Sequence, residues 1–156
     1  MPELVGSDAK QLVDWLCKEW WEESPGVCIV EGFPGVGKTR VAEEVAERLS
    51  NKSVCTAWAE YPESRTGALD DLAFVLAESF AQVGDERVAE TLDLEVVPEI
   101  LNTPTLLVID EFQRSLRNGK PEKGLTNWLK TLSGTKGRVL LLSSQDVDEG
   151  LSLIHI

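Results

Sequence analysis

The chain has 156 residues, 42% of them hydrophobic, and its 27 acidic and 15 basic residues leave a formal net charge of -12 at pH 7. This length fits one domain, and the apolar fraction is large enough for a packed core, which excludes a disordered chain. The negative charge repels nucleic-acid backbones and anionic lipids, so we expect this chain to bind neither nucleic acid nor membrane directly.

The predicted elements alternate between helix and strand along the chain. Asp8 is suited to cap a first helix, and apolar residues then recur at helical spacing as far as Trp20. The later elements are a strand at 27–31, a glycine-rich turn at 32–37, a helix at 39–49, a strand at 54–59, helices at 69–84 and 85–92, a strand at 105–109, a polar and basic loop at 114–124, a helix at 125–132 and a strand at 138–142.

This alternation predicts an α/β fold, a three-layer α/β/α sandwich with a mainly parallel sheet. The runs VCIVE, TLLVID and RVLLLS are continuously apolar, as is typical of parallel strands that helices cover on both faces. The sequence therefore predicts four strands in one sheet.

The three cysteines, Cys17, Cys28 and Cys55, show no C-x-x-C spacing. Cys28 and Cys55 lie in apolar runs, so we expect reduced, buried thiols rather than a disulfide or a zinc site. The N-terminus lacks the pattern of a secretory signal, and the apolar runs are much shorter than the ~20 residues of a membrane span. These features favour a cytoplasmic protein.

The turn after the first strand carries the motif with the clearest chemistry. The segment GFPGVGKT matches G-x-x-x-x-G-K-[ST] (the Walker-A motif) at every fixed position, between a predicted strand and a predicted helix. The glycines let successive main-chain N–H groups face a phosphate, and the helix N-terminus adds positive partial charge. We expect the nucleotide to be bound by Gly32, Pro34, Gly35, Val36, Gly37, Lys38 and Thr39.

Two residues of this motif have further expected roles. Lys38 places an ammonium group against the β- and γ-phosphates and is therefore a catalytic candidate as well. Thr39 supplies a hydroxyl oxygen, a hard ligand suited to Mg²⁺. Arg40 follows the motif and faces either the nucleotide or solvent; we include it among the candidate binding residues.

A second motif (Walker B) ends the strand at 105–109, where Asp110 and Glu111 follow four apolar residues. Ligands of open α/β sheets sit at the carboxyl ends of strands, so this pair is expected beside the phosphate-binding turn. We expect Asp110 to hold Mg²⁺ through a bound water, and Glu111 to orient or deprotonate the water that attacks the γ-phosphate. The alternative for Glu111 is a structural carboxylate, with the catalytic base elsewhere.

Polar residues also follow the fourth strand. Ser143, Ser144 and Gln145 either reach the γ-phosphate or the attacking water, or form a plain turn. We keep Ser144 as a candidate for nucleotide binding. Arg114 and Arg117 could contact phosphate in trans, although their spacing does not require it.

The segments LVGSDAKQLVDWL, EGFPGVGKTRVAEEVAERL, TLLVIDEF and RVLLLSSQ resemble, in order and spacing, the nucleotide-binding core of STAND and related AAA+ ATPases, which include the NACHT, NB-ARC and origin-recognition-like branches. The resemblance implies that Leu4, Val5 and Gly6 lie near the adenine and that the strand at 138–142 lies between the two Walker strands. It also implies ATP and Mg²⁺ as ligands, other domains or protomers of the same parent protein as partners, and an ATP-driven switch that hydrolysis resets.

Some positions depart from this family pattern. Gln145 stands where many STAND proteins have an arginine, and Ser7 replaces the arginine of a leading V-G-R motif. The segment LSLIHI matches nothing in the pattern and reads like a translated sequencing adapter. We therefore expect residues 1–150 to be a partial P-loop domain, without the fifth strand and the helical lid, and 151–156 to be a non-native tail. Its alternating residues are suited to pair at the exposed edge of the strand at 27–31.

Three functions remain open from the sequence. The motifs best fit magnesium-dependent ATP binding and hydrolysis in a regulatory or signalling ATPase, with slow turnover by this chain alone because a lid and a partner arginine are missing. The alternatives are a nucleotide-binding switch without significant hydrolysis and a small-molecule or nucleotide kinase. The choice of ATP over GTP rests on the resemblance and on the lack of an N-K-x-D motif.

Overall fold

A sheet of parallel strands forms the centre of the protein. The computed structural model describes residues 9–23, 26–32, 37–63, 69–117, 120–145 and 154–155, with backbone only at 69–70 and 154–155. The strands are β1 (Val27–Glu31), β2 (Cys55–Glu60), β3 (Thr105–Asp110), β4 (Leu116–Arg117), β5 (Lys120–Pro121), β6 (Arg138–Ser143) and β7 (Ile154–His155). The helices are α1 (Ala9–Trp15), η1 (Leu16–Trp20), α2 (Trp21–Glu23), α3 (Lys38–Ser50), α4 (Leu69–Gln82), α5 (Arg87–Thr91), η2 (Leu94–Val96), α6 (Val97–Ile100), η3 (Phe112–Ser115) and α7 (Lys123–Leu132).

The strand order of the sheet places the two motif-bearing strands on either side of β6. The order is β2-β3-β6-β1-β7, and all neighbouring strands are parallel. In register, Ile29 lies beside Leu141, and Leu141 lies beside Ile109. The position of β6 between β1 and β3 confirms the order that the family resemblance implies. Because the strands are parallel, the carboxyl ends of β1, β6 and β3 meet at one edge of the sheet.

The alternating side chains of these strands fill two hydrophobic cores, one on each face. One core joins the sheet to α4, α6 and α7, and its strand residues include Val27, Ile29, Leu107, Ile109, Val139 and Leu141. The other core joins the sheet to α1, η1 and α3, and its strand residues are Cys28, Val30, Leu106, Val108, Leu140 and Leu142. Burial on both faces explains why β1, β3 and β6 read as continuous apolar runs.

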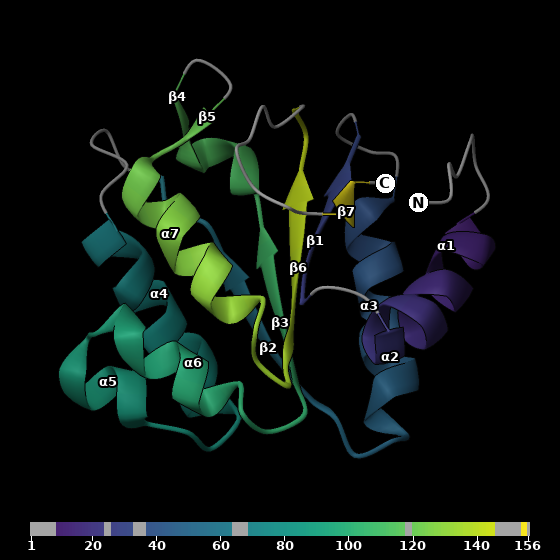
Figure 1. The fold of residues 1–156 in the computed structure, drawn as a ribbon, viewed down its shortest axis with the longest axis horizontal. Helices are drawn as coiled ribbons and strands as arrows, with labels where there is room; N and C mark the ends of the chain where they lie inside the picture. Colours follow the sequence, from purple (N-terminus) through teal and green to yellow (C-terminus); the bar gives the residue numbers. More distant parts are fainter. Residues whose placement is uncertain are drawn as a thin grey trace.

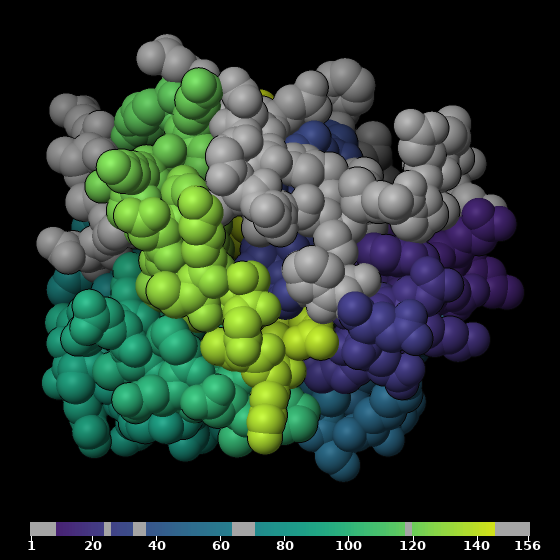
Figure 2. Space-filling view, viewed as in Figure 1, coloured from purple at the N-terminus to yellow at the C-terminus, as the bar shows by residue number. Residues whose placement is uncertain are grey.

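Helices cover both faces of the sheet and form the two outer layers of the fold. Helices α1 to α3 lie on one side of the edge-on sheet, and α4 to α7 lie on the other (Figure 1). The same division appears on the surface, where the purple and blue N-terminal segments face away from the teal and yellow-green ones (Figure 2). The predicted three-layer α/β/α sandwich is therefore confirmed. Within the described residues, no helix combines the length and apolar content that a membrane crossing requires.

The structure also contains short elements that the sequence pattern did not predict. Residues 94–100 form η2 and α6. The stretch expected to be a polar loop, 114–124, contains part of η3, the antiparallel pair β4 and β5, and the first two residues of α7. Elements of two to four residues are too short to show a hydrophobic period, which is why they were missed.

The cysteines differ from expectation at one position. Cys17 and Cys28 are buried, and burial raises the pKa of both thiols, so they stay protonated and unreactive. Cys55 is exposed, contrary to the prediction, because it begins β2, the strand at one edge of the sheet. An apolar run in the sequence does not show whether a strand will lie at the centre or at the edge.

The short strand β7 pairs with the outer edge of β1. The register joins Ile154 to Cys28 and His155 to Ile29, in parallel orientation. This is the pairing that the alternation of LSLIHI predicts, and it occupies the position next to β1 where a fifth strand is expected. The origin of residues 151–156 stays a prediction.

Gly137 is packed tightly against Leu101 and against Thr105, the first residue of β3, so we predict that it does not tolerate a side chain. A Cβ atom there would lie 2.9 Å from the Thr105 carbonyl oxygen and 2.9 Å from Leu101 Cδ2. Gly137→Ala should lower the free energy of unfolding by about 1–3 kcal/mol, the usual cost of overpacking. Gly134→Ala is the control, because a Cβ there meets nothing within 4 Å. Urea unfolding measures both, and equal stability would contradict the prediction.

Candidate functional site

The turn between β1 and α3 is held at both of its ends. The Gly32 N–H donates to the Ser143 carbonyl at 3.1 Å, which ties the end of β1 to the end of β6. Gly37 has a φ of 93°, a left-handed conformation that strains any residue with a Cβ, and it precedes the first residue of α3. Between these glycines, the predicted ligands Pro34, Gly35 and Val36 lie outside the described residues, as does Val5.

Lys38 begins α3 and points back across the turn. Its Nζ donates to the Gly32 carbonyl at 2.7 Å. The ammonium group is therefore held between the two ends of the turn, which is where the motif requires a cation for the β- and γ-phosphates.

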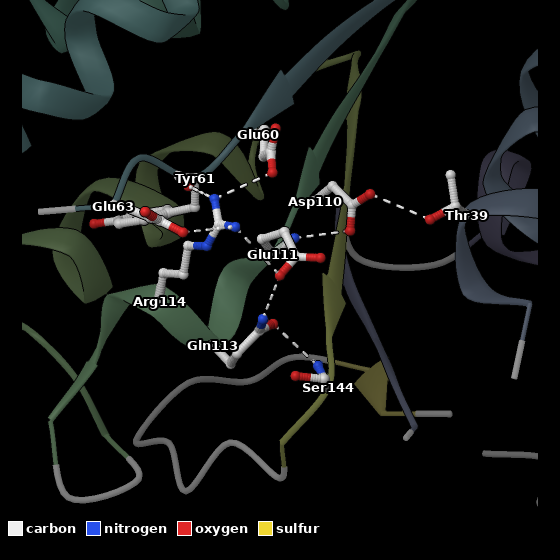
Figure 3. A network of polar contacts seen from close by, with 9 residues as sticks. All are labelled: Thr39, Glu60, Tyr61, Glu63, Asp110, Glu111, Gln113, Arg114 and Ser144. Atoms are coloured by element: carbon white, nitrogen blue, oxygen red, sulfur yellow. Dashed lines mark hydrogen bonds and ion pairs between the residues drawn. The ribbon is translucent and has the colours of Figure 1, made fainter. Parts of the chain in front are cut away.

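Thr39 and Asp110 come from distant parts of the sequence and meet directly. The Thr39 hydroxyl at the start of α3 donates to Asp110 Oδ2 at the end of β3, over 3.2 Å (Figure 3). Both are hard oxygen ligands of the kind that Mg²⁺ prefers. The structure thus brings together the two residues that the sequence proposes for the metal.

Glu111 leaves the sheet in an unusual backbone conformation. Its φ is 57°, in the left-handed region that residues other than glycine seldom adopt. Its N–H donates to Asp110 Oδ1 at 2.8 Å, and the Asp110 carbonyl accepts from the Tyr61 N–H at 2.8 Å. Such strain costs about 1–3 kcal/mol and is common at functional sites. Here it turns the chain sharply after β3, so that two successive carboxylates line the same cleft.

Gln113 connects the Walker-B carboxylate to the end of β6. Its Nε2 donates to Glu111 Oε2 at 2.6 Å, and its Oε1 accepts from the Ser144 N–H at 3.1 Å (Figure 3). The sequence did not predict a role for Gln113, because a glutamine two positions after a carboxylate is not part of any known motif. The predicted Ser144 is therefore at the cleft, where its main-chain N–H contacts Gln113.

Arg114 links Glu111 to the end of β2. Its guanidinium donates to Glu60 at 3.1 Å and to the Tyr61 carbonyl at 3.0 Å, and it lies 3.3 Å from Glu63 and 3.8 Å from Glu111 (Figure 3). The sequence left open whether Arg114 contacts a phosphate in trans; in the structure its side chain is engaged by groups of its own chain. An acidic pair on the β2 side thus holds the arginine beside the Walker-B carboxylate.

These residues surround a cleft of about 790 Å³, which is large enough for a nucleotide. Its described lining comprises Gly37, Lys38, Thr39, Arg40, Glu43, Glu44, Glu47, Asp110, Glu111, Gln113 and Ser144. The predicted candidates that the structure describes, apart from Gly32, line this one cleft, and Gly32 is tied to it through Lys38. The glutamates on the exposed face of α3 were not predicted to line the cleft; their helical position beside the turn was the only available signal.

Magnesium fits the oxygen atoms of this site. Proteins usually bind Mg²⁺ through one or two side-chain oxygens, with water and substrate phosphates as the other ligands. Thr39 and Asp110 would hold the ion, and their hydroxyl and carboxylate are already adjacent. When bound, the ion would neutralise phosphate charge and orient the nucleotide.

The fold and the site together define a P-loop nucleotide-binding core. It is a parallel sheet in which β6 lies between β1 and β3, with the phosphate-binding turn after β1 and two carboxylates after β3. The chain belongs to the AAA domain family, whose profile matches residues 22–149. This confirms the AAA+ part of the predicted resemblance.

Solved structures share this fold. Drosophila ORC bound to DNA gives a TM-score of 0.62 at 19% identity, covering 94% of this chain and 41% of that chain. The Aeropyrum pernix ORC2 protein in ADPNP-ADP complexes gives 0.57 at 17% identity, with 92% and 42% covered. Cdc6p from Pyrobaculum aerophilum gives 0.57 at 16% identity, with 93% and 42% covered.

At these identities the similarity shows the fold alone. This chain spans less than half the length of each of these structures. A comparison with curated proteins found no significant match.

Tyr61, the only tyrosine of the chain, is buried behind the site, where its ring meets Phe112 edge to face at 6.1 Å. Burial raises its pKa to about 12, above the ordinary value of about 10. The unfolded chain therefore loses this proton first, and we predict that stability falls as pH rises from about 10 to 12. Tyr61→Phe should remove that part of the slope.

The ultraviolet absorbance of tyrosinate measures this titration without interference from a second tyrosine. The native midpoint should lie near 12 and the midpoint in urea near 10. A native midpoint equal to the one in urea would show that the phenol is not buried.

Proposed function

We propose that this chain binds ATP with Mg²⁺ and hydrolyses it, as the ATPase core of a larger regulatory protein of the STAND or AAA+ type. The observation that carries the proposal is the contact between Thr39 and Asp110, at 3.2 Å. It supports one shared site for the phosphate-binding turn and the Walker-B carboxylates, in a cleft of about 790 Å³. Membership of the AAA domain family supports ATP as the nucleotide.

The proposed chemistry follows from the positions of four side chains. Lys38 binds the β- and γ-phosphates, and Thr39 and Asp110 hold the magnesium ion. Glu111 orients the attacking water and accepts its proton, so that ATP and water become ADP and inorganic phosphate. Arg40, exposed at the rim of the cleft, adds positive charge near the nucleotide.

The charge of the cleft supports magnesium dependence. Its described lining carries two cationic side chains, Lys38 and Arg40, against five carboxylates, Glu43, Glu44, Glu47, Asp110 and Glu111. Such a cleft repels free ATP, because polyphosphate and carboxylates are both negative. The magnesium complex has less negative charge, and the ion attracts the carboxylates, so the site is suited to Mg·ATP.

A second, smaller pocket lies beside the cleft and is a candidate site for the adenine base. It has a volume of about 450 Å³ and shares Gly37, Arg40 and Glu44 with the cleft. Ala9, Val13 and Val41 add apolar surface between α1 and α3. We propose that the adenine lies on this side of the turn, which agrees with the expected role of Val5 just before α1.

The alternative of a switch without significant hydrolysis has one observation in its favour. The Glu111 carboxylate is bonded to Gln113 and lies 3.8 Å from Arg114, so it is engaged within the chain. A base held in this way has to change partners before it can accept a proton from water. Hydrolysis and binding therefore have to be measured separately.

Calorimetry and phosphate release test the proposal. Mg·ATP should bind to the wild type and fail to bind when EDTA removes the metal or Lys38→Met removes the ammonium group. Glu111→Gln should keep binding and lower single-turnover hydrolysis by roughly 10²- to 10⁴-fold, the usual contribution of a general base.

Glu90→Gln is the matched control, since it makes the same chemical change at an exposed residue of α5 that does not line the cleft. It should retain both binding and hydrolysis. Binding without hydrolysis in the wild type would favour the switch. No magnesium-dependent binding at all would overturn the proposal.

We also propose that the partners of this core are other domains or protomers of the parent protein, and not nucleic acid. Structures of the same fold include ORC bound to DNA and DnaA bound to AMPPCP and single-stranded DNA, but those chains extend well beyond this one. The net charge of -12 opposes contact with phosphate backbones. Labelled duplex and single-stranded DNA should show no change in anisotropy at physiological salt; binding that weakens steeply with salt would contradict the proposal.

A further inference from the structure

The amide of Gln113 is placed between two groups that are both expected to respond to nucleotide. One is the Glu111 carboxylate, and the other is the N–H of Ser144 at the end of β6. Gln113 is half-buried and belongs to η3, the short helix directly after Glu111. It is therefore a direct connection between the Walker-B motif and the segment after the neighbouring strand.

The chemistry of the two partners determines which way the amide faces. A main-chain N–H only donates, so the Gln113 oxygen must face Ser144. The Gln113 NH₂ group then faces Glu111, whose carboxylate oxygen accepts its hydrogen bond. Both bonds are satisfied in one orientation only, at 3.1 Å and 2.6 Å, and a flipped amide would lose both.

Further hydrogen bonds hold the chain next to Ser144 in place. The Ser143 hydroxyl donates to the Gln145 carbonyl at 2.6 Å and accepts from the Gln145 N–H at 3.2 Å. The Ser143 carbonyl accepts from Gly32 at the start of the phosphate-binding turn. Ser143, the last residue of β6, is thus hydrogen-bonded to the turn, and the next residue, Ser144, is hydrogen-bonded to Gln113, which in turn donates to Glu111.

We infer that Gln113 is a positioning residue that sets the place of the Glu111 carboxylate according to the state of the turn and of the segment after β6. A phosphate that shifts this segment also shifts the acceptor end of the Gln113 amide, and the donor end carries the shift to Glu111. The inference rests on the proposed role of Glu111 in hydrolysis, although the contact itself does not.

A spectroscopic test examines the contact without requiring turnover. The chain has four glutamines, Gln11, Gln82, Gln113 and Gln145. Labelling them with ¹⁵N gives four side-chain NH₂ pairs, and the pair that disappears in Gln113→Met belongs to Gln113. This pair should change its chemical shift in Glu111→Gln, because the acceptor of the Gln113 NH₂ group changes from a carboxylate to an amide.

Magnesium with a non-hydrolysable ATP analogue should shift the same NH₂ pair. A Gln113 pair that is unchanged in Glu111→Gln, or that does not respond when the analogue binds to the protein, would overturn the inference.

The rate of ATP hydrolysis is the functional readout. Two substitutions distinguish the hydrogen bond from Gln113 to Glu111 from the one between Gln113 and Ser144. Gln113→Glu has nearly the same shape and keeps the acceptor for Ser144, but it replaces the donor to Glu111 with a second carboxylate. Gln113→Met removes both bonds at similar volume. Both variants should lower kcat by roughly 10- to 100-fold, as loss of an orienting partner does at metal sites, with little change in KM.

Gln113→Glu should lower kcat further than Gln113→Met, because it adds a second negative charge beside the Glu111 carboxylate. Gln82→Met, at an exposed position on α4, is the control for the same substitution elsewhere. Wild-type kcat in both Gln113 variants would overturn the inference. If the wild type binds no Mg·ATP while the Gln113 NH₂ pair still changes in Glu111→Gln, the proposed function is overturned instead.

Discussion

The position of β6 between β1 and β3 is the constraint on which the site depends. Since all three strands are parallel and buried on both faces, their carboxyl ends lie at one edge of the sheet and cannot shift without breaking both cores. The turn after β1 is bonded to the end of β6, and Asp110 at the end of β3 meets Thr39 at the start of α3. A rigid sheet thereby positions groups that the chain supplies from distant segments.

The site gathers charged side chains, most of them of the same sign, around one cleft. Glu111 adopts a left-handed backbone, and the carboxylates of the cleft outnumber its cations. Carboxylates so close together repel one another, and the contacts of Arg114 and Gln113 with Glu111 offset part of this repulsion. A divalent cation would offset much more of it. The charges of the cleft are therefore better balanced when a metal-bound polyphosphate is present than in the chain alone.

Two sets of contacts connect Glu111 to other parts of the protein. Gln113 connects it to the segment after β6, and Arg114 connects it to Glu60 and Tyr61 at the end of β2. The carboxylate proposed as the base is thus held by residues of its own chain. In a protein that acts as a switch, such contacts allow the base to be withheld until nucleotide or a partner changes them.

The sequence by itself determined the α/β class, the phosphate-binding turn and the pair Asp110–Glu111, because these depend on local periodicity and on residue types at fixed spacing. It also placed β6 between the other strands, but only through family resemblance. Tertiary structure alone decided that Cys55 lies on an edge strand, that Gln113 joins Glu111 to Ser144, and that Arg114 pairs within the chain. These outcomes depend on which distant segments become neighbours, and no local pattern carries that information.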